Sequence, residues 1–181
     1  MNETTVHYLN VFLGSGAILL QILSVLALGF LFLGPRKNKF LDFIDKNFLV
    51  LGFLISLSAA LFSLVYSEII GFPPCYLCWY QRIFLFSPVF IFGVAMWHKD
   101  RKIIKYVLPL LAVGGVISVY QNFFYYFGEG SSLPCDASGV SCYQVLISEF
   151  GGYISIPMLA LTSFFSILVI CVVAHFYNKR D

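Results

Sequence analysis

Two cysteines, Cys75 and Cys78, stand two residues apart in the stretch Cys-Tyr-Leu-Cys-Trp-Tyr-Gln-Arg, between two long apolar runs. Residues that precede a proline resist the helical conformation, so Pro73 and Pro74 predict that one helix ends before them and another begins near Cys78. At the N-terminal end of a helix, the dipole and the unpaired backbone N–H groups favour the thiolate. Arg82 follows Cys78 by four residues and is expected on the same helical face. The spacing predicts a redox-active dithiol that faces a cation.

The composition around this motif is that of a membrane protein. Of the 181 residues, 60% are hydrophobic and only 11% are charged, a balance that soluble domains seldom show. Five segments exceed the roughly 17 residues that a helix needs to cross the hydrocarbon core. They are 9–33, 48–70, 79–97, 103–127 and 152–176. The sequence predicts one all-α membrane domain, 1–181. It offers no basic stripe for nucleic acid, because Lys and Arg fall in short clusters between the apolar runs.

The positive charges predict the orientation of the five spans. Ten of the eleven Lys and Arg residues fall on one side of the membrane: Arg36, Lys37, Lys39, Lys46, Lys99, Arg101, Lys102, Lys105, Lys179 and Arg180. By the positive-inside rule that side is cytoplasmic, which places the N-terminus outside and the C-terminus inside. Arg82 is the exception and lies within a span, where it is either a functional residue or an anchor that snorkels to the surface.

The same topology brings a second cysteine pair to the outer side. Cys135 and Cys142 lie in the loop before the last span, and disulfides persist in the oxidising compartment that such a loop faces. Residues 143–150 are mildly amphipathic and are expected to lie in the membrane interface. Pro157 predicts a kink in the last span. Cys171, late in that span, is interpreted as a small apolar packing residue.

With these residues in place, the chain resembles the disulfide bond formation protein B (DsbB) family of bacterial membrane oxidoreductases. The residues that carry the resemblance are Cys75, Cys78, Tyr80, Gln81 and Arg82, the loop pair Cys135 and Cys142, and Ser155-Ile156-Pro157 at the start of the last span. Only six residues separate the loop cysteines, as in the short-loop, BdbC-like type. The resemblance covers 48–176 and implies a four-helix transmembrane bundle, to which 9–33 adds one N-terminal helix.

The resemblance also implies a function and its site. A DsbA-like thioredoxin-fold dithiol carrier would attack the loop disulfide at Cys135, and the released thiol would attack the Cys75–Cys78 disulfide. Cys78 would then pass the electrons to a membrane quinone, ubiquinone or menaquinone. The implied location is the bacterial cytoplasmic (inner) membrane, with both cysteine pairs outside the cytoplasm.

The quinone contacts are expected from the same motif. The resemblance implies Tyr80, Gln81 and Arg82 as the contacting residues. Many members of the family carry a histidine in the third helix of the bundle, where this chain reads Gln121-Asn122. A quinone contact from that histidine is therefore not carried over.

Two other interpretations of the cysteines stay open. The four outer cysteines could bind a structural zinc ion, or they could form two structural disulfides in a non-enzymatic membrane protein. Closing a loop as short as Cys75–Cys78 stabilises a fold by only about 2 kcal/mol and often strains the bond. Because strained, exposed disulfides are the labile ones, this pair favours catalysis over a purely structural role.

Overall fold

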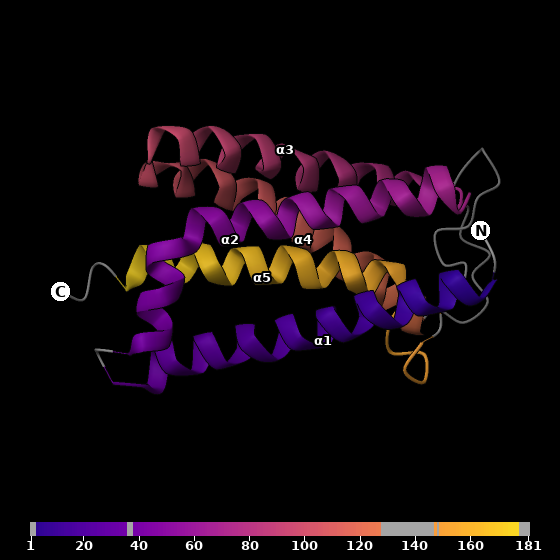
Figure 1. The fold of residues 1–181 in the computed structure, drawn as a ribbon, viewed down its shortest axis with the longest axis horizontal. Helices are drawn as coiled ribbons and strands as arrows, with labels where there is room; N and C mark the ends of the chain where they lie inside the picture. The colour runs from indigo at the N-terminus through magenta and orange to yellow at the C-terminus, as the bar shows by residue number, and fades with distance from the viewer. Residues whose placement is uncertain (1–2, 36–37, 128–146, 148, 178–181) are drawn as a thin grey trace.

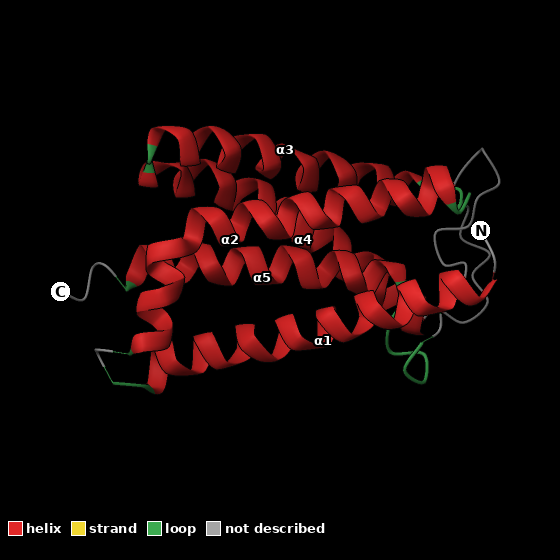
Figure 2. Cartoon of the chain, in the orientation of Figure 1, coloured by secondary structure: helices red, strands yellow, loops and turns green. Residues whose placement is uncertain are grey.

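The computed structural model describes residues 3–35, 38–127, 147 and 149–177. Within these ranges the chain forms five long helices and no strand beyond an isolated bridge between Glu149 and Ile154 (Figure 2). The helices are α1 (Glu3–Leu33), α2 (Lys39–Leu64), α3 (Tyr76–His98), α4 (Ile104–Phe127) and α5 (Ile156–Phe176). Each is long and apolar enough to cross a membrane, which confirms the predicted all-α membrane protein.

The second helix begins at Lys39 rather than near residue 48, so the predicted boundary is wrong. The side chain of Asn38 caps it by accepting a hydrogen bond from the backbone N–H of Phe40, at 2.9 Å. Asp42 and Lys46 form an ion pair one turn apart on the helix. The helix therefore begins about two turns before the predicted span, because hydropathy locates the apolar segment of a helix and not its first residue.

The last helix corrects a second expectation. Pro157 does not kink α5 but lies in its first turn, where the missing N–H of proline removes no helical hydrogen bond. Ser155 is the N-cap, and its hydroxyl accepts a hydrogen bond from the backbone N–H of Met158 at 3.3 Å. Gly151 and Gly152, both with positive φ, turn the chain just before this start.

Helices α2 to α5 pack around a shared core, and α1 lies along α5 at its edge (Figure 1). Phe48, Phe92 and Phe164 are the largest wholly buried side chains. The close packing depends on Gly52, because a Cβ there would lie 2.5 Å from the ring of Phe92.

The bundle has two ends of different character. At the CxxC end, α1 and α3 begin and α2 and α4 finish. At the opposite end α1 finishes, α2 begins and the short 3-10 turn Arg101–Ile103 connects α3 to α4. Apart from Arg82, the described Lys and Arg residues all belong to the opposite end: Lys39, Lys46, Lys99, Arg101, Lys102 and Lys105.

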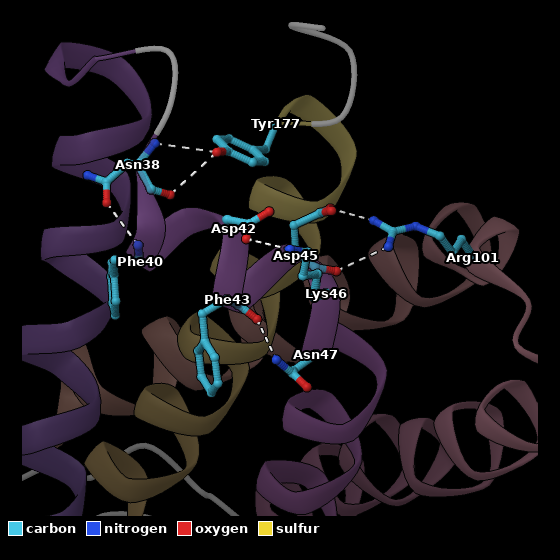
Figure 3. Close-up of polar contacts among 9 residues, drawn as sticks. All are labelled: Asn38, Phe40, Asp42, Phe43, Asp45, Lys46, Asn47, Arg101 and Tyr177. Carbon is cyan, nitrogen blue, oxygen red and sulfur yellow. Dashed lines mark hydrogen bonds and ion pairs between the residues drawn. The ribbon is translucent and has the colours of Figure 1, made fainter.

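Polar contacts tie the helices together at the opposite end (Figure 3). Arg101 forms an ion pair with the carboxylate of Asp45 and donates to the backbone carbonyl of the same residue at 3.1 Å. Its Cζ also lies 4.7 Å from the ring centroid of Phe48. The hydroxyl of Tyr177 exchanges two long contacts of 3.4 Å with the backbone of Asn38. This end is held by bonds between helices.

Candidate functional site

The two cysteines of the motif lie together at the start of α3. Cys75 is the N-cap residue, with an extended backbone, and Cys78 follows in the first turn. Both are free thiols, and their Sγ atoms lie 3.1 Å apart. Cys75 is buried, whereas Cys78 is partly exposed. Two sulfurs so placed can form and break a disulfide with small side-chain movements, and Cys78 is the one that another molecule reaches more easily.

A chain of two amides leads from α3 to these sulfurs. The side-chain N–H of Gln81 donates to the carbonyl oxygen of Gln121, on α4, at 2.8 Å. The amide nitrogen of Gln121 then lies 3.6 Å from Sγ of Cys75 and 3.7 Å from Sγ of Cys78. Gln121 is only 2% exposed. Its N–H groups can therefore stabilise negative charge on either sulfur in surroundings that contain little water.

The neighbouring amide serves the packing of the helices. Asn122 donates to the backbone carbonyls of Ser118, at 2.8 Å, and of Pro157, at 2.9 Å. It thereby joins α4 to the first turn of α5. Of the pair Gln121-Asn122, the structure brings the first to the cysteines and the second to a helix junction. The sequence carried a signal for both, since adjacent amides are unusual in a membrane span.

Arg82 lies inside the bundle and is bonded to α2. Its Nε donates to the hydroxyl of Ser63 at 3.0 Å, and its Nη2 donates to the backbone carbonyl of Ser63 at 2.9 Å. The guanidinium carbon lies 5.1 Å from the ring centroid of Trp79. Arg82 is 8% exposed, and no carboxylate pairs with it in the part of the chain that the structure describes. A buried cation with only neutral partners can still attract a developing negative charge.

A cavity of about 580 Å³ opens beside these residues. Cys78, Gln81 and Arg82 all line it, together with apolar residues of α1, α2 and α5. Its size lies within the range of sites for small molecules, and a mostly apolar wall with a few convergent donors is typical of them.

Of the other predicted site residues, Tyr80 lies elsewhere. It is 51% exposed, does not line the cavity and packs its ring against Tyr76, with centroids 6.2 Å apart. Cys135 and Cys142 fall outside the described residues. The structure thus brings together Cys75, Cys78, Gln81 and Arg82, and it adds Gln121.

Comparison with known proteins identifies the family of this chain. The family described as disulfide bond formation protein DsbB matches residues 45–174. Probable disulfide formation protein C 2 of Bacillus anthracis is 37% identical over 138 residues, which are 76% of this chain and 97% of that protein. Disulfide bond formation protein C of Bacillus subtilis (strain 168) is 40% identical over 122 residues, 67% of this chain and 88% of that protein. No solved structure matches the chain.

The matched segment contains the CxxC pair, Gln81, Gln121 and Arg82, and it begins after α1. The described part of this segment holds a free thiol pair at a helix start, in a bundle of membrane-spanning helices, and such a pair can carry out thiol–disulfide exchange. The chain therefore belongs to the DsbB family, as a multi-pass membrane oxidoreductase that generates disulfide bonds.

Proposed function

We propose that this protein reoxidises a DsbA-like thioredoxin-fold dithiol carrier outside the cytoplasm and passes the electrons to a membrane quinone. One observation carries the proposal: the thiol of Cys78, the amide of Gln81 and the guanidinium of Arg82 line the same apolar cavity. A quinone supplies a two-electron acceptor when it is bound there. The apolar walls suit its ring and tail, and the two donors suit its carbonyl oxygens.

The proposed relay consists of two exchanges and one oxidation. A thiolate of the carrier attacks the Cys135–Cys142 disulfide at Cys135, and the second thiol of the carrier resolves the mixed disulfide, which leaves two loop thiols. A loop thiolate then attacks the Cys75–Cys78 disulfide, which restores the loop disulfide and leaves two thiols on α3. Those two thiols give two electrons and two protons to the quinone and close again as a disulfide.

Each residue of the site has a separate task in this scheme. Cys78 faces the cavity, so its sulfur is the one that meets the acceptor. Gln121 donates toward both sulfurs and can hold the charge on whichever is the thiolate. Arg82 adds a fixed positive charge at the cavity wall, where little water screens it. The exposed position of Tyr80 gives no support to a quinone contact, so the proposal assigns it no role.

The test is quinone reduction by the purified protein with a reduced thioredoxin-fold carrier. We expect Cys78→Ser to abolish the reaction. Cys171→Ser is the matched control: this wholly buried cysteine of the α5 core should leave the rate unchanged. A wild-type protein that neither oxidises the carrier nor reduces quinone would favour the alternative of two structural disulfides.

The loop pair is tested separately. Cys142→Ser should abolish oxidation of the carrier, because Cys135 then has no partner for a disulfide and the thiolate of the carrier finds no S–S bond to attack. Cys135→Ser should abolish oxidation of the carrier while quinone still oxidises Cys75 and Cys78. Full activity of both variants would show that the loop cysteines take no part in the relay.

The proposed orientation places the CxxC end outside the cytoplasm. The basic residues gathered at the opposite end support it. Cysteines are introduced at Ser132 and at Lys102, in a cysteine-free background. The cysteine at position 132 should react with an impermeant label added outside, and the cysteine at position 102 with a label that reaches the cytoplasmic side. Labelling of both from the outside would contradict the orientation.

A further inference from the structure

The first helix is fixed to the bundle along one of its faces. Apart from glycine, its buried residues are spaced at intervals of three, four or seven: Asn10, Ala17, Ser24, Ala27 and Leu31. Such spacing keeps a single face of a helix against its neighbour, and small residues let helices approach closely in a membrane.

Hydrogen bonds on this face hold α1 at a defined depth. The hydroxyl of Tyr66, in the π-helical turn Val65–Ile69 that follows α2, donates to the side-chain carbonyl of Asn10 at 2.7 Å. Gln21 donates to the hydroxyl of Thr162, on α5, at 2.7 Å. Polar bonds between membrane helices specify position as well as strength, because an unpaired polar group is costly in hydrocarbon.

Gly14 adds a steric constraint on the same side. A Cβ at Gly14 would lie 2.6 Å from the ring of Phe150, in the segment just before α5. A larger residue at position 14 would force this ring to shift. Together with the hydrogen bonds to Tyr66 and Thr162, this contact makes α1 a positioned element of the bundle.

A second face of α1 lines the cavity beside Cys78. Several of the lining residues follow the three- or four-residue spacing of one helical face: Phe12, Leu13, Gly16, Leu19 and Leu20. Gly16 stands in the middle of this row, and a Cβ added there would meet no neighbouring group within 4 Å. The cavity is therefore open directly above Gly16.

We propose that α1 is one wall of the quinone site and that the open space at Gly16 holds part of the bound quinone. The inference rests on the proposed function, since it takes the quinone as the occupant of the cavity. The family match begins at residue 45, so this wall lies outside the segment that the chain shares with the family. The remaining lining residues come from α2, α3 and α5 and from the segment between α2 and α3, so α1 is one of four helices that enclose the cavity. The shape of α1 thus limits which quinones this protein can hold.

The experiment fills the cavity from α1 without touching the cysteines. The variants Gly16→Ala, Gly16→Leu and Gly16→Phe add increasing volume at a position that has room for a side chain. Gly29→Phe is the matched control, because a Cβ at Gly29 also meets no neighbouring group within 4 Å and Gly29 does not line the cavity. All variants carry Trp97→Phe, which leaves Trp79, beside Arg82, as the sole tryptophan.

Binding is measured by quenching of Trp79 fluorescence with decylubiquinone and with menadione, and the quinone that the wild-type protein binds more tightly is used for the series. We expect Gly16→Ala to bind within about twofold of wild type, and Gly16→Phe to raise the Kd by about tenfold or more, because overpacking removes the space that the ligand uses. Gly29→Phe should bind like wild type. Single-turnover oxidation of the carrier without quinone should be the same in every variant.

The outcomes separate this inference from the proposed function. Unchanged binding in Gly16→Phe, or an equal loss in Gly29→Phe, would overturn the role of α1 while leaving quinone reduction intact. A wild-type protein that binds neither quinone and reduces neither would overturn the proposed function, and the inference with it.

Discussion

Two arginines occupy nearly the same pose at opposite ends of the bundle. Each guanidinium donates to the backbone carbonyl of a residue on α2 and to the side chain of that same residue. For Arg82 the residue is Ser63, and for Arg101 it is Asp45. Each guanidinium also lies over an aromatic ring. The two sites differ in the partner, since Arg82 has a hydroxyl where Arg101 has a carboxylate, and in burial, since Arg82 is buried and the side chain of Arg101 is 40% exposed.

That difference assigns the two arginines to different tasks. The carboxylate of Asp45 compensates the charge of Arg101, so this contact joins helices and leaves no net charge. The hydroxyl of Ser63 orients Arg82 without neutralising it. An uncompensated cation that is 8% exposed in a membrane helix costs free energy to maintain. On the proposed function, the comparison predicts a structural role for Arg101 and a role in the chemistry of the cavity for Arg82.

The largest expected effect comes from removing the charge at the CxxC end. Arg82→Met keeps the length of the side chain and should lower kcat/KM for quinone by about ten- to a hundredfold, because a fixed charge is lost where negative charge develops. Arg101→Met, measured in parallel, should leave quinone kinetics unchanged. Equal quinone kinetics in Arg82→Met and wild type would show that the two arginines do the same structural work.

The amide beside the sulfurs sharpens the same comparison. Gln121→Leu keeps the volume of the side chain but removes the donor to both cysteines, and it should slow quinone reduction by about tenfold. The control is Asn122→Leu, which should lower the melting temperature through the lost bonds to Ser118 and Pro157 and should affect the rate per folded molecule less. A slower rate in Asn122→Leu than in Gln121→Leu would assign the role in quinone reduction to Asn122.

Part of this site could be predicted from spacing along one helix. Pro73 and Pro74 lie in the short non-helical segment before α3, as predicted, and Cys75 and Cys78 lie at the start of α3. Arg82 shares the cavity wall with Cys78 because they are four residues apart. Such inferences succeed because they depend only on helix geometry.

The contacts between helices could not be predicted in the same way. Ser63 precedes Arg82 by 19 residues, and Gln121 follows Gln81 by 40. The two residues of each pair lie on different helices, and nothing in the sequence tells how one helix is rotated relative to the other. The role of α1 in the cavity was hidden for the same reason. Tyr80 shows the converse, since its place in the motif implied a site residue and its helical face directs it away from the cavity.

At the opposite end the expected effects are on stability. Arg101→Met removes the partner of Asp45, which is only 14% exposed at its side chain, and should lower the free energy of unfolding by about 1 kcal/mol. Arg101→Lys should recover part of this loss, since it restores the charge without the planar fork. Thermal unfolding in detergent measures both. A loss of activity without a loss of stability would contradict the structural role.

The smallest expected effects concern the start of α2, where Asn38 makes two kinds of contact. Its side chain caps the helix through the N–H of Phe40, so Asn38→Ala should lower the free energy of unfolding by about 1 kcal/mol. Tyr177 instead bonds to the backbone of Asn38, at 3.4 Å. Because these contacts are long, Tyr177→Phe should lower the free energy of unfolding by about 0.5 kcal/mol or less.

Because Asn38→Ala leaves that backbone in place, the two losses should add in the double variant. A combined loss that differs from the sum by more than about 0.5 kcal/mol would show that the cap and the tyrosine form one coupled unit. Quinone kinetics should stay at the wild-type value in all three variants, since neither residue lines the cavity at the CxxC end.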